Sequence, residues 1–532
     1  MNLWLLTLLG GILLWLGWPV LPFPFLLFVG FVPLLFIEDY ISRNPEVYKG
    51  KHFFLYTYVT FLIWNTGTTW WVYYASPVGA VFMILANALL MSIPLLLFRF
   101  TKKGAGPGWG YFSLVLYWIS FEYIHLNWDI SWPWLTLGNG FSTFPEWIQW
   151  YEFTGVFGGT LWIWIVNILF FFALNNRTAV NGIKSINARF LVYAFLLIGL
   201  PIAYSYYIYS TYEEAGEPVE VVVLQPNIDP YTEKFIGSEN FIPFEEQLER
   251  FFELSAQKIT PSTSFLVWPE TAIDFNFREE RIETYPYFQK IERFKDRFPN
   301  LSLLSGVVSS TVYEDERDHM PSTRFDERIG YYDVFNTGMF LENDTVAFYH
   351  KSKLVPGVEI MPYPEAIGFV SDLLFDLGGT SGGYGRQTEK TVFFNNDSVG
   401  IAPSICYESI YGDYMREFVL NGADFIFIIT NDGWWWKSSG YKQHLQYATL
   451  RAIENRRSIA RSANTGISCF INQRGDILQP TEFWTQDVIK GIIKSNDEIT
   501  FYTRYGDYIA RTTIWLSVFV FLAGIVKRKL TR

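Results

Sequence analysis

The chain has 532 residues, enough for two or three domains; 50% of them are hydrophobic and only 17% are charged. Since about 25% of the residues of an average soluble protein are charged, this composition indicates a membrane protein. The net charge of −11 comes without a basic stripe, which argues against a nucleic-acid partner.

Eight membrane-spanning helices are predicted. Residues 3–36 are almost wholly apolar but are interrupted by Pro19, Pro22 and Pro24, which predicts two short or tilted spans. No small-residue cleavage site follows the first of them, so we expect an anchor and not a removed signal. The other six spans are expected at residues 53–74, 80–97, 108–123, 158–174, 190–209 and 509–526.

Basic residues occupy alternate loops between these spans. Loops 76–79 and 122–159 have none, and the other connections and the C-terminal tail carry Arg43, Lys49, Lys51, Arg99, Lys102, Lys103, Arg177, Lys184, Arg189, Lys527, Arg528, Lys529 and Arg532. The positive-inside rule then places both termini in the cytoplasm. We expect a seven-span domain at residues 1–211, an extracytoplasmic globular domain at 212–500, and a last span with a basic tail at 501–532.

Tryptophans mark the loop at residues 127–140, on the same side as the globular domain. Trp128, Trp132 and Trp134 suit the membrane interface, where an amphipathic ring is stable. The tryptophans of this loop either form an interfacial belt or contact the substrate, and the sequence favours neither alternative.

The segment 212–500 alternates strands with helices. Helices are predicted at 244–257, 285–298 and 441–455, and strands at 219–227, 264–268, 302–308, 337–341, 345–349, 398–405 and 425–430. This alternation predicts a layered α/β fold. The run 425–429 has no polar residue, so it is expected to be a central strand buried on both faces.

Three reactive side chains follow strands of this segment. Glu270 ends the run FLVWPE, Lys351 follows a predicted strand, and Cys406 ends the run IAPSIC. Open α/β sheets place their sites at such strand ends. A thiol needs a base and a nearby positive charge to become a nucleophile, and these residues supply both. Each residue alone has an ordinary structural reading, but their joint occurrence favours a catalytic site.

No metal or cofactor is predicted. The five histidines are scattered and none is paired at ligand spacing. The glycine-rich segment 378–383 lacks the Lys-Ser ending of a phosphate loop and is interpreted as a flexible linker. Both cysteines, Cys406 and Cys469, are expected to be free thiols, because Cys469 lies in an alternating run typical of a strand.

The motifs around the three reactive residues resemble the Glu-Lys-Cys triad of the nitrilase superfamily. They are WPE ending at Glu270, YHKSKLVP with Lys351, and SICYES with Cys406. With eight spans around such a domain, the chain resembles the apolipoprotein N-acyltransferases, the last enzymes of bacterial lipoprotein maturation. The likeness extends over essentially the full length, through PWLTLGN (133–139), EFTGVFGGT (152–160), QPNI (225–228), FNTG (335–338), TNDGW (430–434) and RSANTGIS (461–468).

This resemblance implies an αββα sandwich for the globular domain and a ping-pong acyl transfer. Cys406 would attack the sn-1 ester of a phospholipid and form a thioester, with Glu270 taking the thiol proton. Lys351 and the backbone N–H of Tyr407 would stabilise the oxyanion. The N-terminal amine of a diacylglyceryl-modified apolipoprotein would then accept the acyl chain. The expected setting is the bacterial inner membrane, with a monomeric, multi-pass enzyme that contacts membrane lipid and has its catalytic domain on the periplasmic side.

Supporting roles follow from the same resemblance. Glu359 is assigned to holding Lys351, with an exposed surface glutamate as the alternative, and Tyr407 and Glu408 are assigned as supporting residues. Phe235 is matched to the aromatic residue that the family has after QPNI. The chain departs from the family at Lys353, where histidine is common, and at residues 357–358. Trp434, Trp435 and Trp436 form either a lipid-facing lid or an interfacial anchor.

Two other functions use the same sequence features. A membrane-tethered nitrilase-type amidase would apply the triad to a small amide and release ammonia. A catalytically silent scaffold would tolerate Cys406→Ser. Both proposed substrates of the acyltransferase lie in the membrane, and a thioester must be shielded from water, which favours the acyltransferase over the amidase. The scaffold is disfavoured because Glu270, Lys351 and Cys406 are all present with intact flanking motifs.

Overall fold

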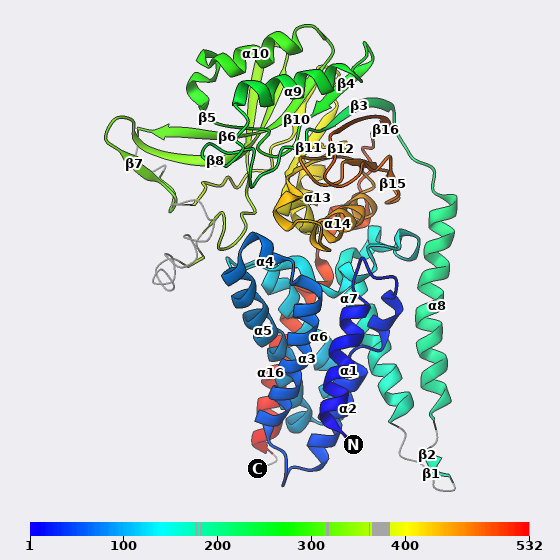
Figure 1. The fold of residues 1–532 in the computed structure, drawn as a ribbon. Coiled ribbons are helices and arrows are strands. Elements are labelled where there is room, and N and C mark those ends of the chain that lie inside the picture. The colour runs from blue at the N-terminus through cyan, green and yellow to red at the C-terminus, as the bar shows by residue number, and fades with distance from the viewer. Residues whose placement is uncertain are drawn as a thin grey trace. The chain divides into compact units, whose positions relative to one another are not determined.

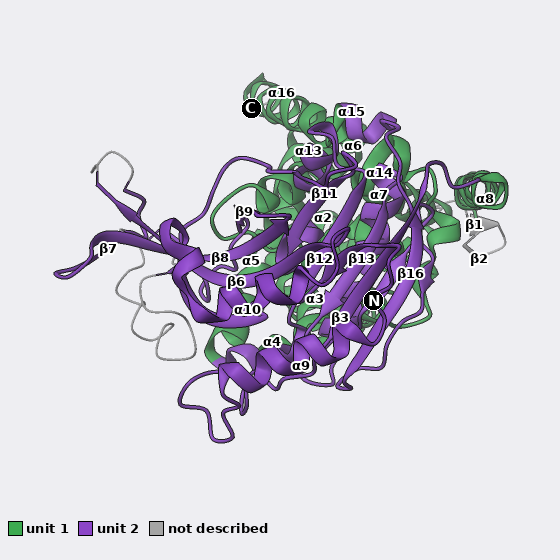
Figure 2. Ribbon diagram, turned by 90° about the horizontal axis from the view of Figure 1, so that it is seen from above, with its two compact units in different colours: residues 1–73, 78–212, 505–532 green, residues 74–77, 213–504 purple. Residues whose placement is uncertain are grey.

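The computed structural model describes residues 1–175, 179–180, 183–184, 186–314, 319–360, 362–363 and 383–530. Arg177, Arg532 and residues 378–382 of the glycine-rich segment, which were used above, lie outside this range. The described chain divides into two compact units, residues 1–73, 78–212 and 505–532, and residues 74–77 and 213–504 (Figure 2).

The first unit is helical, with a helix at every predicted span. These helices are α1 (Leu3–Leu16), α2 (Val32–Arg43), α3 (Gly50–Thr69), α5 (Pro77–Ala105), α6 (Pro107–Leu126), α7 (Tyr151–Leu174), α8 (Ala188–Thr211) and α16 (Tyr508–Leu530). Five segments of the described chain are long and apolar enough to cross a membrane: Pro24–Arg43, α5, α7, α8 and α16. Because α1, α3 and α6 do not meet that standard, the count of eight spans stays a prediction.

Aromatic rings and one buried carboxylate hold the helical unit together. The ring of Phe31 lies 4.2 Å from that of Trp164 and 5.2 Å from that of Trp118, and all three are buried. The carboxylate of Glu122 accepts hydrogen bonds from Trp118 Nε1 (2.8 Å), Leu137 N (2.8 Å) and Thr160 Oγ1 (2.7 Å). Three donors compensate the cost of placing this group among apolar helices.

The tryptophan-rich loop packs partly inside the helical unit. Trp134 is 2% exposed and its ring lies edge-on against that of Trp71, at 4.8 Å. This tryptophan therefore contributes to internal packing, while Trp128 and Trp132 are half-buried.

The second unit contains two large β-sheets (Figure 1). The first has the order β16 (Asp487–Lys494), β3 (Pro218–Gln225), β4 (Thr263–Val267), β6 (Ser302–Tyr313), β8 (Gly330–Glu342) and β7 (Arg324–Asp326), with β5 (Ile273–Arg278) on β6 and β9 (Thr345–His350) on β8. The second has the order β10 (Phe393–Phe394), β11 (Gly400–Ile405), β12 (Phe425–Thr430), β13 (Ser458–Ala463), β14 (Cys469–Ile471) and β15 (Ile477–Leu478). In each sheet the central strands run parallel, β3 with β4 and β6, and β11 with β12 and β13.

The two sheets pack face to face between two helical layers. On the inner side, the ring of Phe265 in β4 lies 5.3 Å from that of Phe427 in β12. Helices α9 (Phe244–Ala256) and α10 (Pro286–Lys295) bury their apolar faces on the outer side of the first sheet. Helices α13 (Gly412–Leu420) and α14 (Gly440–Asn455) accompany the second sheet. This four-layer αββα sandwich confirms the layered fold predicted for the globular domain.

Most predicted strands and helices of this domain are present, and β12 is buried along its whole length, as its apolar run indicates. The strand that contains Cys469 is β14, and both cysteines are free and buried. The prediction ended β6 at residue 308 and began β8 only at residue 337, and it omitted β5, β7, β10, β13, β15, β16 and α13. Among the strands, β5, β13 and β16 and the missed parts of β6 and β8 carry charged or hydroxyl side chains, which hides the strand pattern.

Candidate active site

Glu270, Lys351 and Cys406 follow the ends of β4, β9 and β11, and the fold brings these three ends together. Lys351 Nζ lies 3.2 Å from Glu270 Oε1. The charges of both residues act on the Cys406 thiol. All three side chains are buried, so the site is shielded from bulk water.

A second carboxylate and an amide complete the surroundings of Lys351. Its ammonium donates to Glu359 Oε1 at 2.8 Å, and Glu359 Oε2 accepts from Val355 N at 2.8 Å. Asn336 Nδ2 donates to both carboxylates, to Glu270 Oε1 at 2.8 Å and to Glu359 Oε1 at 3.1 Å. Glu359 is thus buried and paired, which excludes the alternative that it is a surface glutamate.

Backbone contacts fix the position of Glu270 at the end of β4. Gly306 N donates to Pro269 O at 3.1 Å, and a Cβ on Gly306 would lie 2.6 Å from Glu270 Cα. Only glycine allows this close approach of β6. On the other side, Asn431 N donates to Glu270 Oε2 at 3.1 Å.

Cys406 occupies a tight turn between β11 and the short helix η8 (Cys406–Ile410). Its φ of +51° is a left-handed conformation that is strained for a residue with a side chain. Hydrogen bonds hold the turn: Cys406 O accepts from Ser409 Oγ (2.8 Å) and from His444 Nε2 (3.0 Å). Strained turns of this kind present a nucleophile at the end of a sheet.

Glu408 connects this turn with the segment that carries Lys351. Its Oε2 accepts from Ile405 N at 2.9 Å, and its Oε1 accepts from Ser352 N at 2.7 Å and from Tyr349 OH at 2.6 Å. One fully buried carboxylate thereby joins the residues before Cys406 to those on both sides of Lys351. Burial raises the pKa of Glu408.

Among the three central residues, Cys406 is a neutral thiol and Lys351 is a cation held in place by carboxylates. Burial has the largest effect on Cys406 and raises its pKa. The negative charge of Glu270 raises this pKa further, whereas the positive charge of Lys351 lowers it. Burial alone would lower the pKa of Lys351, but the carboxylates of Glu270 and Glu359 hold it well above its usual range. Cys406 is therefore protonated at neutral pH and needs a base at the moment of attack.

The neighbouring Lys353 has different surroundings. Its ammonium lies 4.9 Å from the ring centre of Tyr411, in a cation–π contact, and Tyr411 packs edge-on against Tyr407. Burial lowers the pKa of Lys353. Of the two lysines, Lys351 is thus the one bound between carboxylates.

The four aromatic residues assigned to lipid contact do not form one group. Phe235 stacks on Trp434 (5.9 Å between ring centres), and the exposed Trp436 stacks on Trp484 (5.6 Å). Trp435 contacts the ring of His444 edge-on at 5.6 Å. Tyr231 packs against both Trp434 (5.4 Å) and Trp436 (6.0 Å), so Phe235, Trp434 and Trp436 belong to one aromatic cluster. Trp435 lies apart from it and packs against a residue that supports the Cys406 turn.

Sequence reasoning missed a buried charged cluster beneath Cys406. Asp432 Oδ2 accepts from Arg461 Nη2 at 2.7 Å, and Asp432 Oδ1 lies 3.0 Å from His444 Nδ1. Burial alone would raise the pKa of Asp432, but Arg461 and His444 lower it to about 2. Asp432, Arg461 and Asn336 lie in the family motifs TNDGW, RSANTGIS and FNTG, which could have marked them as site residues. His444 lies in none of these motifs.

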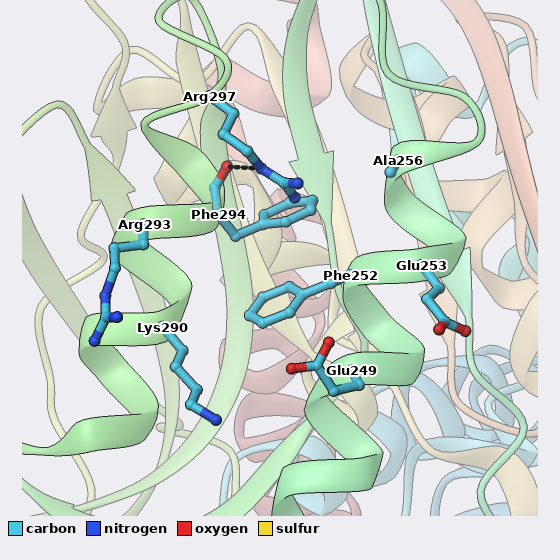
Figure 3. Close-up of a pocket in the computed structure, with 8 residues that line it drawn as sticks. All are labelled: Glu249, Phe252, Glu253, Ala256, Lys290, Arg293, Phe294 and Arg297. Carbon is cyan, nitrogen blue, oxygen red and sulfur yellow. Dashed lines mark hydrogen bonds between the residues drawn. The ribbon is translucent and has the colours of Figure 1, made fainter.

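Other potential sites lie away from the triad. Within the described residues, no group of His, Cys, Asp and Glu is arranged to hold a metal ion. A hollow of about 460 Å³ lies between α9 and α10, where Phe252 stacks on Phe294 (Figure 3). Charged side chains line the rest of it: Glu249, Glu253, Lys290, Arg293 and Arg297. None of the predicted site residues lines it.

Comparison with known proteins gives the family. Residues 10–169 match the apolipoprotein N-acyltransferase N-terminal domain, and residues 306–500 match the carbon-nitrogen hydrolase domain. The apolipoprotein N-acyltransferase of Chlorobaculum tepidum is 30% identical over 98% of this chain and 97% of its own length. That of Geobacter metallireducens is 28% identical over 95% and 92%. The protein is therefore a membrane protein with a nitrilase-like domain, and it belongs to the apolipoprotein N-acyltransferase family.

Proposed function

We propose that this protein transfers a fatty acyl chain from the sn-1 ester of a phospholipid to the N-terminal amine of a diacylglyceryl-cysteine apolipoprotein. One observation carries the proposal: the ammonium of Lys351 is held between Glu270 and Glu359, beside a buried Cys406 in a strained turn. Family membership along the whole chain supports this choice of substrates.

The first half-reaction acylates the cysteine. Glu270 accepts the proton of the Cys406 thiol as Sγ attacks the ester carbonyl, which matches a thiol whose pKa is raised. Lys351 and the backbone N–H of Tyr407 stabilise the oxyanion of the tetrahedral intermediate. The bond from the carbonyl carbon to the glycerol oxygen then breaks, and Glu270 returns its proton to that oxygen, which releases a lysophospholipid.

The second half-reaction moves the acyl chain to the acceptor. The α-amine attacks the thioester carbonyl while Glu270 takes one of its protons. The carbon–sulfur bond breaks, Cys406 recovers its proton from Glu270, and the amide leaves. Water must stay out between the two steps, and the burial of all three residues favours this.

The arrangement in the membrane is part of the same proposal. We assign eight spans within residues 1–211 and 501–532, with both termini in the cytoplasm, and we place residues 212–500 on the periplasmic side together with the loops 76–79 and 122–159. Basic residues in alternate loops support this orientation. The proposal includes a monomeric enzyme, because the proposed chemistry uses Glu270, Lys351 and Cys406 of the same chain and requires no second subunit.

The test is the intact mass of purified protein mixed with phosphatidylethanolamine, wild type beside Cys406→Ala. The proposal requires an added mass of one acyl chain that is absent from the variant and is removed by a diacylglyceryl-cysteine peptide. A folded wild type that reacts with iodoacetamide but gains no acyl chain refutes the proposal. Ammonia release from a small amide would then favour an amidase.

A further inference from the structure

The imidazole of His444 donates a hydrogen bond to the backbone of the proposed nucleophile. His444 is 1% exposed, and its Nε2 lies 3.0 Å from Cys406 O. A carbonyl oxygen can only accept, so Nε2 carries the hydrogen of this bond. The same Nε2 lies 3.1 Å from Ser409 Oγ, whose own hydroxyl donates to Cys406 O, so the imidazole N–H is shared between the two oxygens. His444 belongs to α14, outside the turn that it contacts.

That carbonyl shares a peptide unit with the proposed oxyanion donor. The C=O of Cys406 and the N–H of Tyr407 lie in one plane, and no cis peptide occurs among the described residues. In a trans peptide the two groups point in opposite directions. Fixing the direction of the carbonyl therefore also fixes the direction of the Tyr407 N–H.

We propose that His444 is a positioning residue that aims the Tyr407 N–H at the oxyanion, an inference that rests on the proposed acyl-transfer function. A donor on the carbonyl also polarises the peptide and strengthens its N–H as a hydrogen-bond donor. No other residue discussed above reaches this peptide from outside the turn, because Ser409, which also donates to Cys406 O, belongs to η8 and moves with it.

The turn needs such an external contact because it is strained. A residue other than glycine at φ +51° costs free energy that the surrounding structure must supply. Glu408, itself in η8, accepts from Ile405 N at 2.9 Å and from Ser352 N, outside the turn, at 2.7 Å. His444 donates to the peptide that follows Cys406, so the backbone is fixed on both sides of this residue.

Buried charges fix His444 in turn. Its Nδ1 lies 3.0 Å from Asp432 Oδ1 and 3.1 Å from Arg461 Nη2, and Arg461 is bound to Asp432 at 2.7 Å. Asp432 follows β12 and Arg461 lies in β13, so the imidazole is anchored to the centre of the second sheet. Arg461 and Asp432 thus hold the ring in the orientation that presents Nε2 to Cys406 O.

The experiment compares two reactions of Cys406 in the full-length protein. Acylation, by p-nitrophenyl butyrate and by phosphatidylethanolamine, passes through an oxyanion, whereas alkylation by iodoacetamide does not. The variants are His444→Leu, which removes the donor, and His444→Gln, whose amide can still donate. The matched control is Asn496→Leu, because Asn496 Nδ2 also donates, at 2.8 Å, to the carbonyl of a left-handed residue, Arg456 (φ +49°).

The inference requires His444→Leu to lower kcat of acylation by both esters by about 10-fold or more, towards the 10²–10³-fold typical of a lost oxyanion donor. KM and the alkylation rate should stay near wild type, His444→Gln should recover most of kcat, and Asn496→Leu should behave as wild type. The inference is overturned if acylation and alkylation fall together, if neither falls, or if Gln does not restore kcat.

The same data separate this inference from the proposed function. A wild type that is acylated by the nitrophenyl ester but not by the phospholipid refutes the proposed substrate, while the His444 variants still report on the oxyanion donor. A wild type that forms no thioester with either ester overturns both.

Discussion

Glu359 Oε1 lies closer to Lys351 Nζ than Glu270 Oε1 does, 2.8 Å against 3.2 Å. Each carboxylate has its other oxygen bound to a backbone amide, Glu359 Oε2 to Val355 N at 2.8 Å and Glu270 Oε2 to Asn431 N at 3.1 Å. The two differ in their distance from the cation. In the proposed reaction the closer Glu359 therefore holds Lys351, and the more weakly paired Glu270 accepts the proton.

Glu359→Gln should reduce acylation by about 10- to 100-fold, because the amide offers one acceptor where the carboxylate offers two. Its NH₂ group must face either Lys351 and Asn336 or Val355 N, which are all donors. An unmatched buried donor costs about 1–3 kcal/mol, and 1.4 kcal/mol is a factor of about 10. The rate of single-turnover acylation measures the effect, with the exposed Glu389→Gln as control. Wild-type kinetics in Glu359→Gln would remove Glu359 from the site.

Glu270→Gln and Lys351→Met should both abolish acylation but should change alkylation of Cys406 in opposite directions. Glu270 raises the pKa of the thiol and Lys351 lowers it. Losing the carboxylate therefore increases the thiolate fraction at pH 8, and losing the ammonium decreases it. A neighbouring charge shifts a pKa by about one to three units, so iodoacetamide rates should differ from wild type by about 10-fold or more each way. Equal alkylation rates in the two variants would contradict the assigned charges.

The pH dependence of alkylation in the wild type provides a separate check. The pKa of Cys406 is raised above its ordinary value by burial, so the thiol form is favoured at and below that ordinary value. The iodoacetamide rate should therefore rise by about tenfold per pH unit from pH 7 to 9.5, without a plateau. A plateau below pH 8 would mean a stabilised thiolate and would remove the need for Glu270 as a base.

The sequence predicted those parts of the site that lie at the ends of apolar strands. The runs before Glu270 and Cys406 are buried and uninterrupted, and they form β4 and β11. Each residue thus lies beyond the carboxyl end of its strand, as expected for such folds. Because β4 and β9 belong to the first sheet and β11 to the second, it is the packing of the two sheets that brings the three ends together. Lys351 could be placed because it follows the apolar strand β9.

The buried cluster of Asp432, His444 and Arg461 could not be predicted in this way, because the local sequence around each residue argues against a buried charged side chain. Arg461 lies in a strand in which every residue is buried, yet a charged side chain argues against a buried strand. Its burial is compensated by the ion pair with Asp432, 29 residues earlier, and by a hydrogen bond to Ile467 O. His444 lies on a helix with no motif, and its partners belong to other elements. Such residues become visible only when the fold brings their partners together.

Trp435→Ser and Trp436→Ser should have different effects, although the residues are adjacent. Trp436 is 47% exposed and stacks on Trp484, so its loss should lower acylation from phospholipid vesicles but not from p-nitrophenyl butyrate. Trp435 contacts His444, so its loss should slow acylation by both donors. Trp436→Phe, which keeps a stacking ring, is the control. Equal activity of Trp436→Ser and wild type on vesicles would exclude a lipid-contacting role for that residue.

The orientation in the membrane can be tested with single cysteines, introduced after both native free thiols, Cys406 and Cys469, have been replaced by alanine. Glu327→Cys reports on the globular domain, and Gly50→Cys reports on a loop with basic residues; both positions are exposed, and a Cβ on Gly50 meets no atom within 4 Å. In intact spheroplasts, a membrane-impermeant maleimide should label position 327, and it should label position 50 only after lysis. Labelling of both positions before lysis would place them on the same side of the membrane and would contradict the eight-span topology. Labelling of position 50 alone would invert the topology and place the proposed active site in the cytoplasm, away from an acceptor in the outer leaflet.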